Sequence, residues 1–342
     1  MEFRPTERKG GTSALMLSLA MRAVVIRKTG GPEVMELTSL DVRAPGPGEA
    51  LVRHRVVGVN FIDTYQRSGL YSLPLPAVLG SEAAGVVEAV GPGAAVSIGT
   101  RVAYASAGNG AYAEARLVNA DRLVPLPDDV TDEIAAASLL KGMTVEYLVC
   151  RARPVRAGET VLFHAAAGGV GLIACQWLRS LGVRVIGAVG SDEKAALARE
   201  YGAEHTIVTS RENVAERVRA LTDGKGVPVV FDSVGKATLA ASLDSLAPRG
   251  MLVSFGNASG KPDPLDLLTL ANKGSLFVTR PVLAHYTATR DELVASATAL
   301  FEKIRSGAVR VRIDRRYPLE EAAEAHRALE ARKTSGSVLL IP

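Results

Sequence analysis

The first third of the chain alternates short apolar runs with turns rich in glycine and proline. Such runs follow one another from Met21 to Val118, and Pro45–Gly48 is one of the turns between them. Short strands with regular turn signals are typical of an antiparallel, barrel-like domain. The pattern predicts strands at residues 22–26, 36–40, 49–59, 83–90, 101–104 and 111–118.

The apolar period then changes to that of a helix at 132–151, and strand and helix patterns alternate beyond it. Alternation of this kind favours a doubly wound parallel sheet, here of six strands. A tail follows with a helix at 291–306, a strand at 309–313, a helix at 319–332 and a strand at 337–341. We expect the tail to return to the first domain. The six predicted strands are 160–164, 184–189, 205–208, 227–232, 251–255 and 275–279, with helices at 170–181, 192–201, 212–221, 237–246 and 265–271 between them.

Residues 1–20 differ from the rest, because a polar, charged stretch precedes a short apolar run at 13–20. We interpret them as a disordered extension, with Met21 opening the folded domain. A cleaved export signal is the alternative, although the apolar run has the minimal length for one.

The stretch from Val161 to Leu172 carries the first functional motif. A β-rich run ends at a turn of small residues, and an apolar helix pattern follows. As a G-x-G-x-x-G fingerprint it has Ala166 in first place, followed by Gly168 and Gly171. The second glycine lets the backbone approach a diphosphate, and the third lets the helix pack against the strand. In a strand–helix array this turn predicts a dinucleotide site.

The end of the second strand of this array indicates which dinucleotide is bound. An acidic residue there usually binds the ribose hydroxyls of NAD. Here the strand ends at Val189-Gly190-Ser191, and Lys194 lies one helical turn further on. An ammonium group at that place suits a 2′-phosphate, so the pattern favours NADPH over NADH. A solvated lysine is the alternative for Lys194 considered alone.

Composition excludes several classes of protein. The 342 residues are 47% hydrophobic and 22% charged, with a formal net charge of +4. No apolar run approaches the ~20 residues of a membrane helix, and the scattered charges do not favour nucleic-acid binding. The two cysteines, Cys150 and Cys175, are predicted to be buried thiols, which fits a reducing compartment and the cytoplasm.

Ordered motifs along nearly the whole chain, Met21 to Pro342, resemble one family. The chain is similar to the zinc-independent, zeta-crystallin-like quinone oxidoreductases of the medium-chain dehydrogenase/reductase superfamily. The motifs are Gly31-Pro-Glu-Val34, Gly58-Val-Asn-Phe-Ile-Asp-Thr-Tyr65, Arg67-Ser-Gly-Leu-Tyr71, Gly80-Ser-Glu-Ala-Ala-Gly85, Lys141-Gly-Met-Thr144, Ala166–Gly171, Phe231-Asp-Ser-Val-Gly235, Ser254-Phe-Gly-Asn257, Gly274-Ser-Leu-Phe-Val-Thr-Arg-Pro281 and Gly336-Ser-Val-Leu-Leu-Ile-Pro342.

The resemblance implies an α/β protein with a GroES-like, β-barrel-type catalytic domain and a Rossmann domain. The expected boundaries are 21–143 and 284–342 for the first and 144–283 for the second, after an extension at 1–20. It also implies a homodimer joined through the last Rossmann strand, near Leu276, Phe277, Val278 and Thr279.

The resemblance also identifies an expected absence. Zinc relatives in this superfamily bind metal through a cysteine and a Gly-His-Glu sequence, and here Asn60 and Gly80-Ser-Glu82 stand in those places. Positions 91–120 contain no cysteine, so the zinc loop is missing too. No metal site is expected, and without a Lewis acid the accessible chemistry is hydride transfer to an already conjugated acceptor.

Site residues follow from the resemblance. It implies that Asn60, Asp63 and Tyr65 lie at the nicotinamide end, where Asn60 binds the ribose or the substrate oxygen. Tyr65 either donates a proton and stacks on a flat ring, or is a packed aromatic side chain. For Asp63, a structural hydrogen-bond acceptor is favoured over a catalytic base. For His164, a histidine packed in the core is favoured over a catalytic one. Many relatives have a tyrosine where Thr209 stands, which weakens the NADPH inference, although Arg211 could compensate. The implied cofactor-binding residues are Thr144, Gly168, Gly169, Val170, Gly190, Lys194, Thr209, Ser233, Phe255, Asn257 and Arg332.

The sequence therefore predicts an NADPH-dependent reductase of quinones that works without metal. An enoyl or alkenal reductase is the enzymatic alternative, and an RNA-binding or crystallin-like protein is the alternative of another class. Which conjugated acceptor is used, and whether one or two electrons move in a step, is left open by the sequence.

Overall fold

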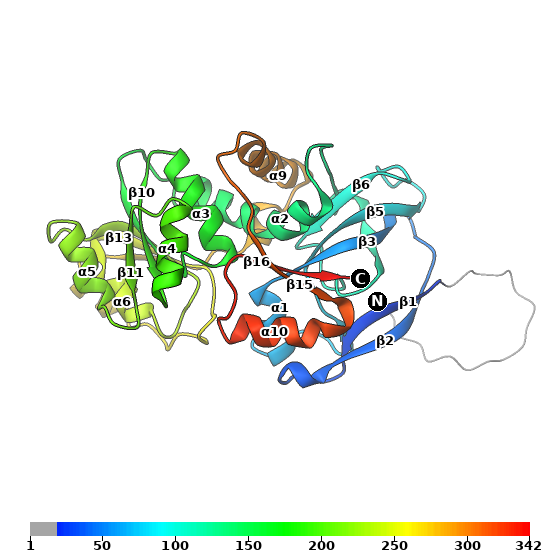
Figure 1. Ribbon diagram of the computed structural model, residues 1–342, viewed down its shortest axis with the longest axis horizontal. Helices are drawn as coiled ribbons and strands as arrows, with labels where there is room; N and C mark the ends of the chain where they lie inside the picture. The colour runs from blue at the N-terminus through cyan, green and yellow to red at the C-terminus, as the bar shows by residue number, and fades with distance from the viewer. Residues whose placement is uncertain (1–18) are drawn as a thin grey trace, which may run out of the picture. The chain divides into compact units, whose positions relative to one another are not determined.

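The computed structural model describes residues 19–342, which form two compact units (Figure 1). The first unit holds the chain up to Leu126 together with Arg316–Arg327 and Leu339–Pro342. The second holds Pro127–Arg315 and Ala328–Val338. The domain boundaries expected from the resemblance stay a prediction.

The first unit is built on antiparallel strands. One sheet has the order β2-β1-β4 and a larger, seven-stranded sheet has the order β15-β16-β3-β5-β6-β8, with β7 paired to β3. The last two strands of the tail therefore join this sheet, as predicted, whereas its first helix, Arg290–Arg305, lies in the second unit. The strands are β1 (Leu19–Ile26), β2 (Met35–Val42), β3 (Glu49–Val59), β4 (Ala77–Val78), β5 (Glu82–Val90), β6 (Arg101–Ala105), β7 (Ala115–Asn119), β8 (Val124–Pro125), β15 (Ile313–Pro318) and β16 (Ser337–Ile341).

The second unit contains the predicted parallel sheet of six strands, in the order β11-β10-β9-β12-β13-β14. The order reverses direction after β9, so β9 and β12 flank the switch point at which doubly wound folds bind ligands. The strands are β9 (Thr160–His164), β10 (Arg184–Val189), β11 (His205–Val208), β12 (Val227–Asp232), β13 (Leu246–Ser254) and β14 (Phe277–Thr279).

Helices connect these strands, and several begin at side-chain caps. Ser191, Asn213 and Thr289 each accept a backbone N–H in the first turn of the helix that follows. No described helix has the length and apolar character needed to cross a membrane. The helices are α1 (Phe61–Ser68), α2 (Asp132–Tyr147), α3 (Gly169–Ser180), α4 (Asp192–Glu200), α5 (Val214–Leu221), α6 (Leu239–Asp244), α7 (Leu267–Asn272), α8 (Leu283–Tyr286), α9 (Arg290–Arg305) and α10 (Ala322–Glu330).

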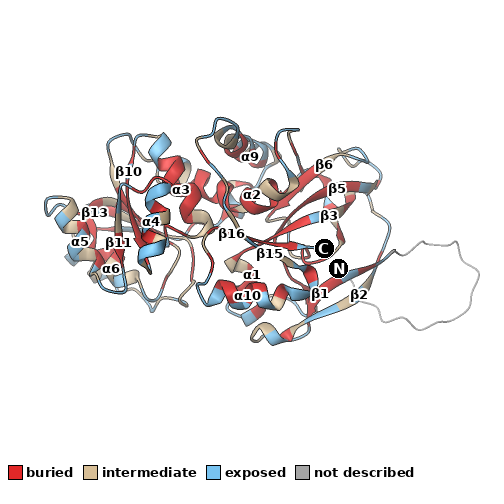
Figure 2. Ribbon diagram, viewed as in Figure 1, coloured by how far each residue is buried: buried red, intermediate tan, exposed pale blue. Residues whose placement is uncertain are grey.

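Burial concentrates along the central strands of each unit (Figure 2). Leu162 of β9, Ile186 of β10 and Val230 of β12 are fully buried in the core of the second unit. A central parallel strand is covered on both faces, which explains its continuous apolar sequence.

Three local predictions were wrong. β1 begins at Leu19, because Leu19 pairs with Val42 in the ladder; residues 1–18 of the predicted extension lie outside the described residues. β7 begins only at Ala115, since Ala111 and Tyr112 hydrogen-bond to Gly80 and Leu79 instead.

The third error is the strand predicted at 309–313. The backbone of Arg310 is bound by a side chain, because its N–H donates to Gln176 Oε1 (2.8 Å) and its carbonyl accepts from Gln176 Nε2 (3.0 Å). The strand β15 starts only at Ile313. Helix α1 was not predicted at all.

Candidate functional site

Asp63 is the centre of a buried polar network in the first unit. It lies in the first turn of α1 and is fully buried. Its carboxylate accepts from the Asn60 backbone N–H (2.9 Å), the Ser81 hydroxyl (2.9 Å) and the Tyr112 hydroxyl (3.1 Å). A carboxylate surrounded by fixed donors serves as a structural acceptor, which is the role that the sequence favoured over a base.

Asn60 is held by a second buried carboxylate. Its Nδ2 donates to Glu82 Oε2 at 2.9 Å, and both side chains are buried. The amide oxygen accepts from the Asp63 backbone N–H in a capping box at the start of α1. Since an amide oxygen has two lone pairs, Asn60 can offer the second one to a ligand. An amide oxygen accepts hydrogen bonds, so it suits a ribose hydroxyl better than a substrate carbonyl.

His326 extends this network, although the sequence assigned it no role. Its Nε2 lies 2.9 Å from the Tyr112 hydroxyl, and its Nδ1 lies 3.4 Å from Arg67 Nη1. Since Tyr112 donates to Asp63, His326 donates from Nε2 and accepts at Nδ1. Burial, and then the positive charge of Arg67, lowers the pKa of His326 to about 3. This histidine is therefore neutral, and only the fold could reveal its partners.

Tyr65 lies among aromatic side chains. Its ring centroid is 5.3 Å from that of Tyr71 in an edge-on contact and 6.2 Å from that of Phe61. The side chain is buried, with 8% of its surface exposed. These contacts show that the ring is packed, and its catalytic role stays a prediction.

The predicted dinucleotide turn lies between β9 and α3 of the second unit. Ala165 takes a left-handed conformation (φ 53°), and the Gly168 N–H donates to its carbonyl at 2.9 Å. A Cβ added to Gly171 would lie 2.3 Å from the Ala165 oxygen, so only glycine fits where the helix packs on the turn. Gly168 is the N-cap and offers no side-chain cap, which leaves the first amides of α3 to a ligand.

Lys194 and Arg332, two residues of the predicted 2′-phosphate site, are in contact beyond β10. Lys194 Nζ donates to the Arg332 carbonyl at 2.7 Å, and Arg332 takes a left-handed conformation (φ 57°). Burial, and then the positive charge of Arg332, lowers the pKa of Lys194. The carboxylate of Asp314 opposes this lowering, and the 2′-phosphate site stays a prediction.

Arg211, by contrast, is already paired. It forms two hydrogen bonds of 2.6 Å with the Asp192 carboxylate. The suggestion that Arg211 compensates for Thr209 is therefore weakened. The Thr209 backbone N–H donates to the Val189 carbonyl at 2.8 Å, which holds the residue beside the end of β10.

Asp232 orders the loop that carries Ser233. Its Oδ1 accepts from the backbone of Val234 (2.7 Å) and Gly235 (3.2 Å), and its Oδ2 accepts from Thr238 and Ser242 (both 2.7 Å). These contacts hold the loop after β12 in one conformation. The backbone N–H groups of Phe255 and Ala258 donate to Asp232 and Ser233, which places the loop carrying Phe255 and Asn257 beside it.

His164 joins the same cluster, with Nε2 3.0 Å from the Ser242 hydroxyl. Burial lowers its pKa, against the opposing effect of Asp232. Ser242 donates to Asp232 rather than to His164. In a nucleophilic triad the serine donates to the histidine, so these three residues do not form one. His164 is a packed histidine, as predicted.

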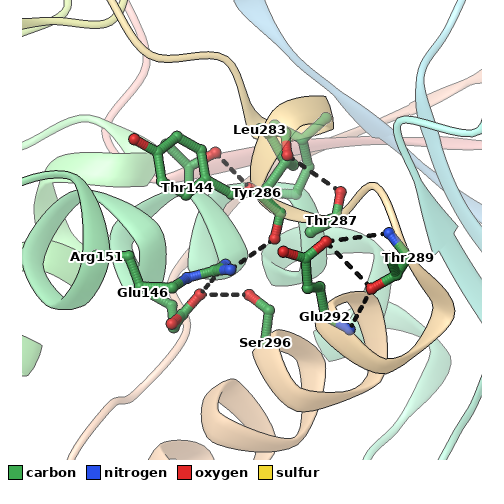
Figure 3. Close-up of polar contacts among 10 residues, drawn as sticks. Thr144, Glu146, Arg151, Leu283, Tyr286, Thr287, Thr289, Glu292 and Ser296 are labelled. Carbon is green, nitrogen blue, oxygen red and sulfur yellow. Dashed lines mark hydrogen bonds and ion pairs between the residues drawn. The ribbon is translucent and has the colours of Figure 1, made fainter. Parts of the chain in front are cut away.

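Thr144 lies in helix α2, and its hydroxyl donates to the Leu140 carbonyl at 2.7 Å. Figure 3 shows the surrounding helices α2, α8 and α9 joined by polar contacts. Arg151 donates to the Tyr286 carbonyl and to Glu146 (both 2.7 Å), and its guanidinium lies 5.3 Å from the centre of the Tyr286 ring. The segment after β14 is thereby fixed to α2.

The cysteines agree with the sequence only in part. Both are free thiols, and Cys175 is buried as predicted, but Cys150 is exposed. Cys150 lies in the π-helical turn Leu148–Ala152 that follows α2. Within residues 19–342 no group of three or more metal-ligating side chains occurs.

Known proteins resemble this chain in both parts. Residues 46–128 match the alcohol dehydrogenase GroES-like domain, and residues 169–294 match the family described as zinc-binding dehydrogenase. A quinone oxidoreductase of Pseudomonas aeruginosa is 55% identical over 92% of this chain and 97% of its own. A 2-haloacrylate reductase of a Burkholderia species is 45% identical over 94% of this chain and 98% of its own.

A solved structure has the same fold. The Escherichia coli quinone oxidoreductase in complex with NADPH superposes with a TM-score of 0.93 and 47% identity, covering 94% of this chain and 100% of that one. Identity at this level over nearly the whole of both chains shows common membership of a family. The chain belongs to the zinc-independent quinone oxidoreductase family of the medium-chain dehydrogenase/reductase superfamily.

Proposed function

We propose that this protein reduces quinones with NADPH and without a metal ion. One observation carries the proposal: the second unit combines a turn that only glycine fits with two cations, Lys194 and Arg332, in contact beyond β10, where we propose that the 2′-phosphate binds. The relatives support it, since several are quinone oxidoreductases and one was solved with NADPH.

The residues of the second unit fit this cofactor. The amides of Gly168, Gly169 and Val170 bind the diphosphate, and Lys194 and Arg332 bind the 2′-phosphate. When bound, NADPH supplies the hydride. The remaining residues that we propose along the cofactor are Thr144 at the nicotinamide, Gly190 and Thr209 near the 2′-phosphate, and Ser233, Phe255 and Asn257 at the adenosine and nicotinamide ends.

Zinc does not fit the first unit. An amide and a hydroxyl, those of Asn60 and Ser81, stand where zinc relatives have thiolate and imidazole, and both are engaged by carboxylates. Zinc prefers sulfur and nitrogen ligands. We therefore route no step through a metal.

The side chains of the first unit orient the reactants. Asn60, with its amide nitrogen held by Glu82 and its oxygen capping α1, offers the second lone pair of that oxygen to a ribose hydroxyl. Asp63 keeps Asn60, Ser81 and Tyr112 in place and takes no proton. Quinone reduction requires one hydride and one proton, and Tyr65 or solvent donates the proton to the quinone oxygen.

The test follows NADPH oxidation with 1,4-benzoquinone and 9,10-phenanthrenequinone, with NADH in parallel and a metal chelator present. Turnover that requires a quinone, is faster with NADPH and survives the chelator is expected. Abolition by the chelator would contradict the metal-independent reading. Tight NADPH binding without turnover of any acceptor would favour the binding-protein alternative.

The similarity to a 2-haloacrylate reductase supports a second candidate, reduction of a conjugated carbon–carbon double bond. A 2-enoyl thioester and an alkenal belong in the same assay. Turnover with these alone would move the function to alkene reduction and leave the cofactor site unchanged.

We also propose a homodimer formed through β14. This strand lies at the edge of the six-stranded sheet, and Phe277 and Val278 are 56% and 40% exposed. An exposed apolar edge strand is a surface for pairing with a second copy. Sedimentation should give a dimer for the protein and a monomer for Phe277→Glu; a monomeric wild type would overturn the proposal. The cytoplasm stays our prediction for its location, supported by the two free thiols.

A further inference from the structure

We propose that Lys141 binds the diphosphate bridge of the dinucleotide and supplies the positive charge that the fingerprint turn lacks. The inference rests on the proposed function, because it takes NADPH as the ligand of that turn. Lys141 is a residue of α2, outside the strand–turn–helix unit that the fingerprint describes.

The side chain of Lys141 lies against the first residue of α3. A Cβ added to Gly169 would have the Cδ and Cε atoms of Lys141 as its nearest neighbours, both at 3.0 Å. The Cα–Cβ bonds of a helix tilt toward its amino end. The lysine stem therefore lies on the side of Gly169 that faces the amino end of α3, where the diphosphate is expected. The ammonium group is one bond beyond Cε.

The burial of the Lys141 side chain is a second indication of its role. Only 5% of Lys141 is exposed, whereas lysine is rarely buried to that extent without a charged or hydrogen-bonding role. An ammonium group carries three N–H donors, so it can bind a phosphate oxygen and another acceptor together. The aliphatic stem packs against Gly169, and the carbonyl of Gly336, 3.2 Å from the added Cβ, is an acceptor beside it. The proposal gives the ammonium group the diphosphate as a further acceptor.

The negative charge of the diphosphate explains why a lysine is needed at this position. The turn from Ala165 to Gly171 has no charged side chain, and amide dipoles alone face a doubly negative diphosphate. Lys194 and Arg332 are bonded to each other at the far end of β10, where the 2′-phosphate is expected. Lys141 is thus the cation that serves the part shared by NADPH and NADH.

The two lysines therefore predict opposite binding patterns. Lys141→Met keeps the stem and removes the charge, so it should weaken NADPH and NADH alike, by about ten- to a hundredfold, with their ratio unchanged. Lys194→Met should weaken NADPH and leave NADH within about twofold. Adenosine 2′-monophosphate, which has no diphosphate, should lose affinity with Lys194→Met and keep it with Lys141→Met.

The experiment measures the dissociation constants of these three probes by calorimetry for the full chain and its variants. Lys141→Arg should restore most of the affinity, and thermal unfolding without ligand checks that each variant is folded. If Lys141→Met does not fold, Lys141→Gln is the second neutral variant. Neutral variants that bind both dinucleotides like the wild type, or that lose NADPH alone, would overturn the proposal.

The measurement on the wild type distinguishes a failure of the role of Lys141 from a failure of the proposed function. A wild type that binds neither dinucleotide would overturn the proposed function and the role of Lys141 together. A wild type that binds NADPH tightly, beside a Lys141→Met variant that binds equally well, would overturn only the role of Lys141.

Discussion

Two regions of this molecule position candidate site residues in different ways. In the first unit, Asp63 accepts hydrogen bonds from Asn60, Ser81 and Tyr112. Tyr112 in turn contacts His326 near the end of the chain. In the second unit, the turn from Ala165 to Gly171 is shaped by its own backbone within seven consecutive residues. The first region depends on distant side chains, and the second depends on the local absence of side chains.

The difference determines what a mutation should do. A network of buried side chains contributes to stability, because removing one member leaves several others without a partner. A glycine turn contributes above all to ligand approach, because added atoms occupy the place of the backbone or of the ligand. The following predictions separate these two kinds of dependence.

The largest expected effect is that of Gly171→Val on cofactor binding. Its Cβ would lie 2.3 Å from the Ala165 oxygen, so the turn must open and the amides of α3 lose their alignment. We expect the affinity for NADPH to fall by more than about a hundredfold, with about 1–3 kcal/mol lost in the free energy of unfolding. Gly190→Ala is the control for stability, since no atom lies within 4 Å of its added Cβ. Unchanged NADPH binding by Gly171→Val would exclude this turn as the cofactor site.

Asp63→Ala should lower the free energy of unfolding by about 3–5 kcal/mol, because it leaves buried donors without their carboxylate. Urea denaturation of the wild type and the variant measures this difference. Asp192→Ala is the matched control: that carboxylate is exposed and paired with Arg211, and no measurable change is expected. Equal effects of the two variants would show that the network around Asp63 does not stabilise the first unit.

Acid should destabilise the first unit through its two buried histidines. Burial, as the main cause, lowers the pKa of His54 and of His326 to about 3 from an ordinary value of 6.5. Below that ordinary value the unfolded chain takes up protons that the folded chain does not. The free energy of unfolding should therefore fall as the pH drops from about 6.5 toward 3, by about 1.4 kcal/mol per pH unit for each histidine. Denaturation at several pH values should give a shallower slope for His326→Gln, and an unchanged slope would refute its neutral state.

The smallest expected effect is that of Arg211→Ala on cofactor preference. Arg211 is bound to Asp192 by two hydrogen bonds, whereas Lys194 is joined to Arg332. The ratio of NADPH to NADH affinity should change by less than about twofold, as is usual for an exposed ion pair. A loss as large as that of Lys194→Met would show that Arg211 leaves Asp192 to bind the 2′-phosphate. Dissociation constants for both cofactors decide between these outcomes.

Local chemistry made the second unit predictable. All six parallel strands and the turn at Gly168 and Gly171 were predicted, because periodicity and small residues act over a few positions. The errors in predicted strands occurred where a residue distant in sequence binds the backbone in place of a neighbouring strand. Gln176 binds the backbone of Arg310 and removes a predicted strand, and Tyr112 bonds to Leu79 before β7 begins.

By itself the sequence determined the α/β class, the six-stranded parallel sheet, the dinucleotide turn and the family. The first three depend on spacing along the chain, which a sequence displays directly, and the family follows from motifs that resemble those of its known members. Only the tertiary structure decided that Asp63 binds Tyr112, that Tyr112 contacts His326, and that the stem of Lys141 lies on Gly169. These partners are far apart in sequence, and they meet because packing of apolar faces brings their helices and strands together, which leaves no local signal to read.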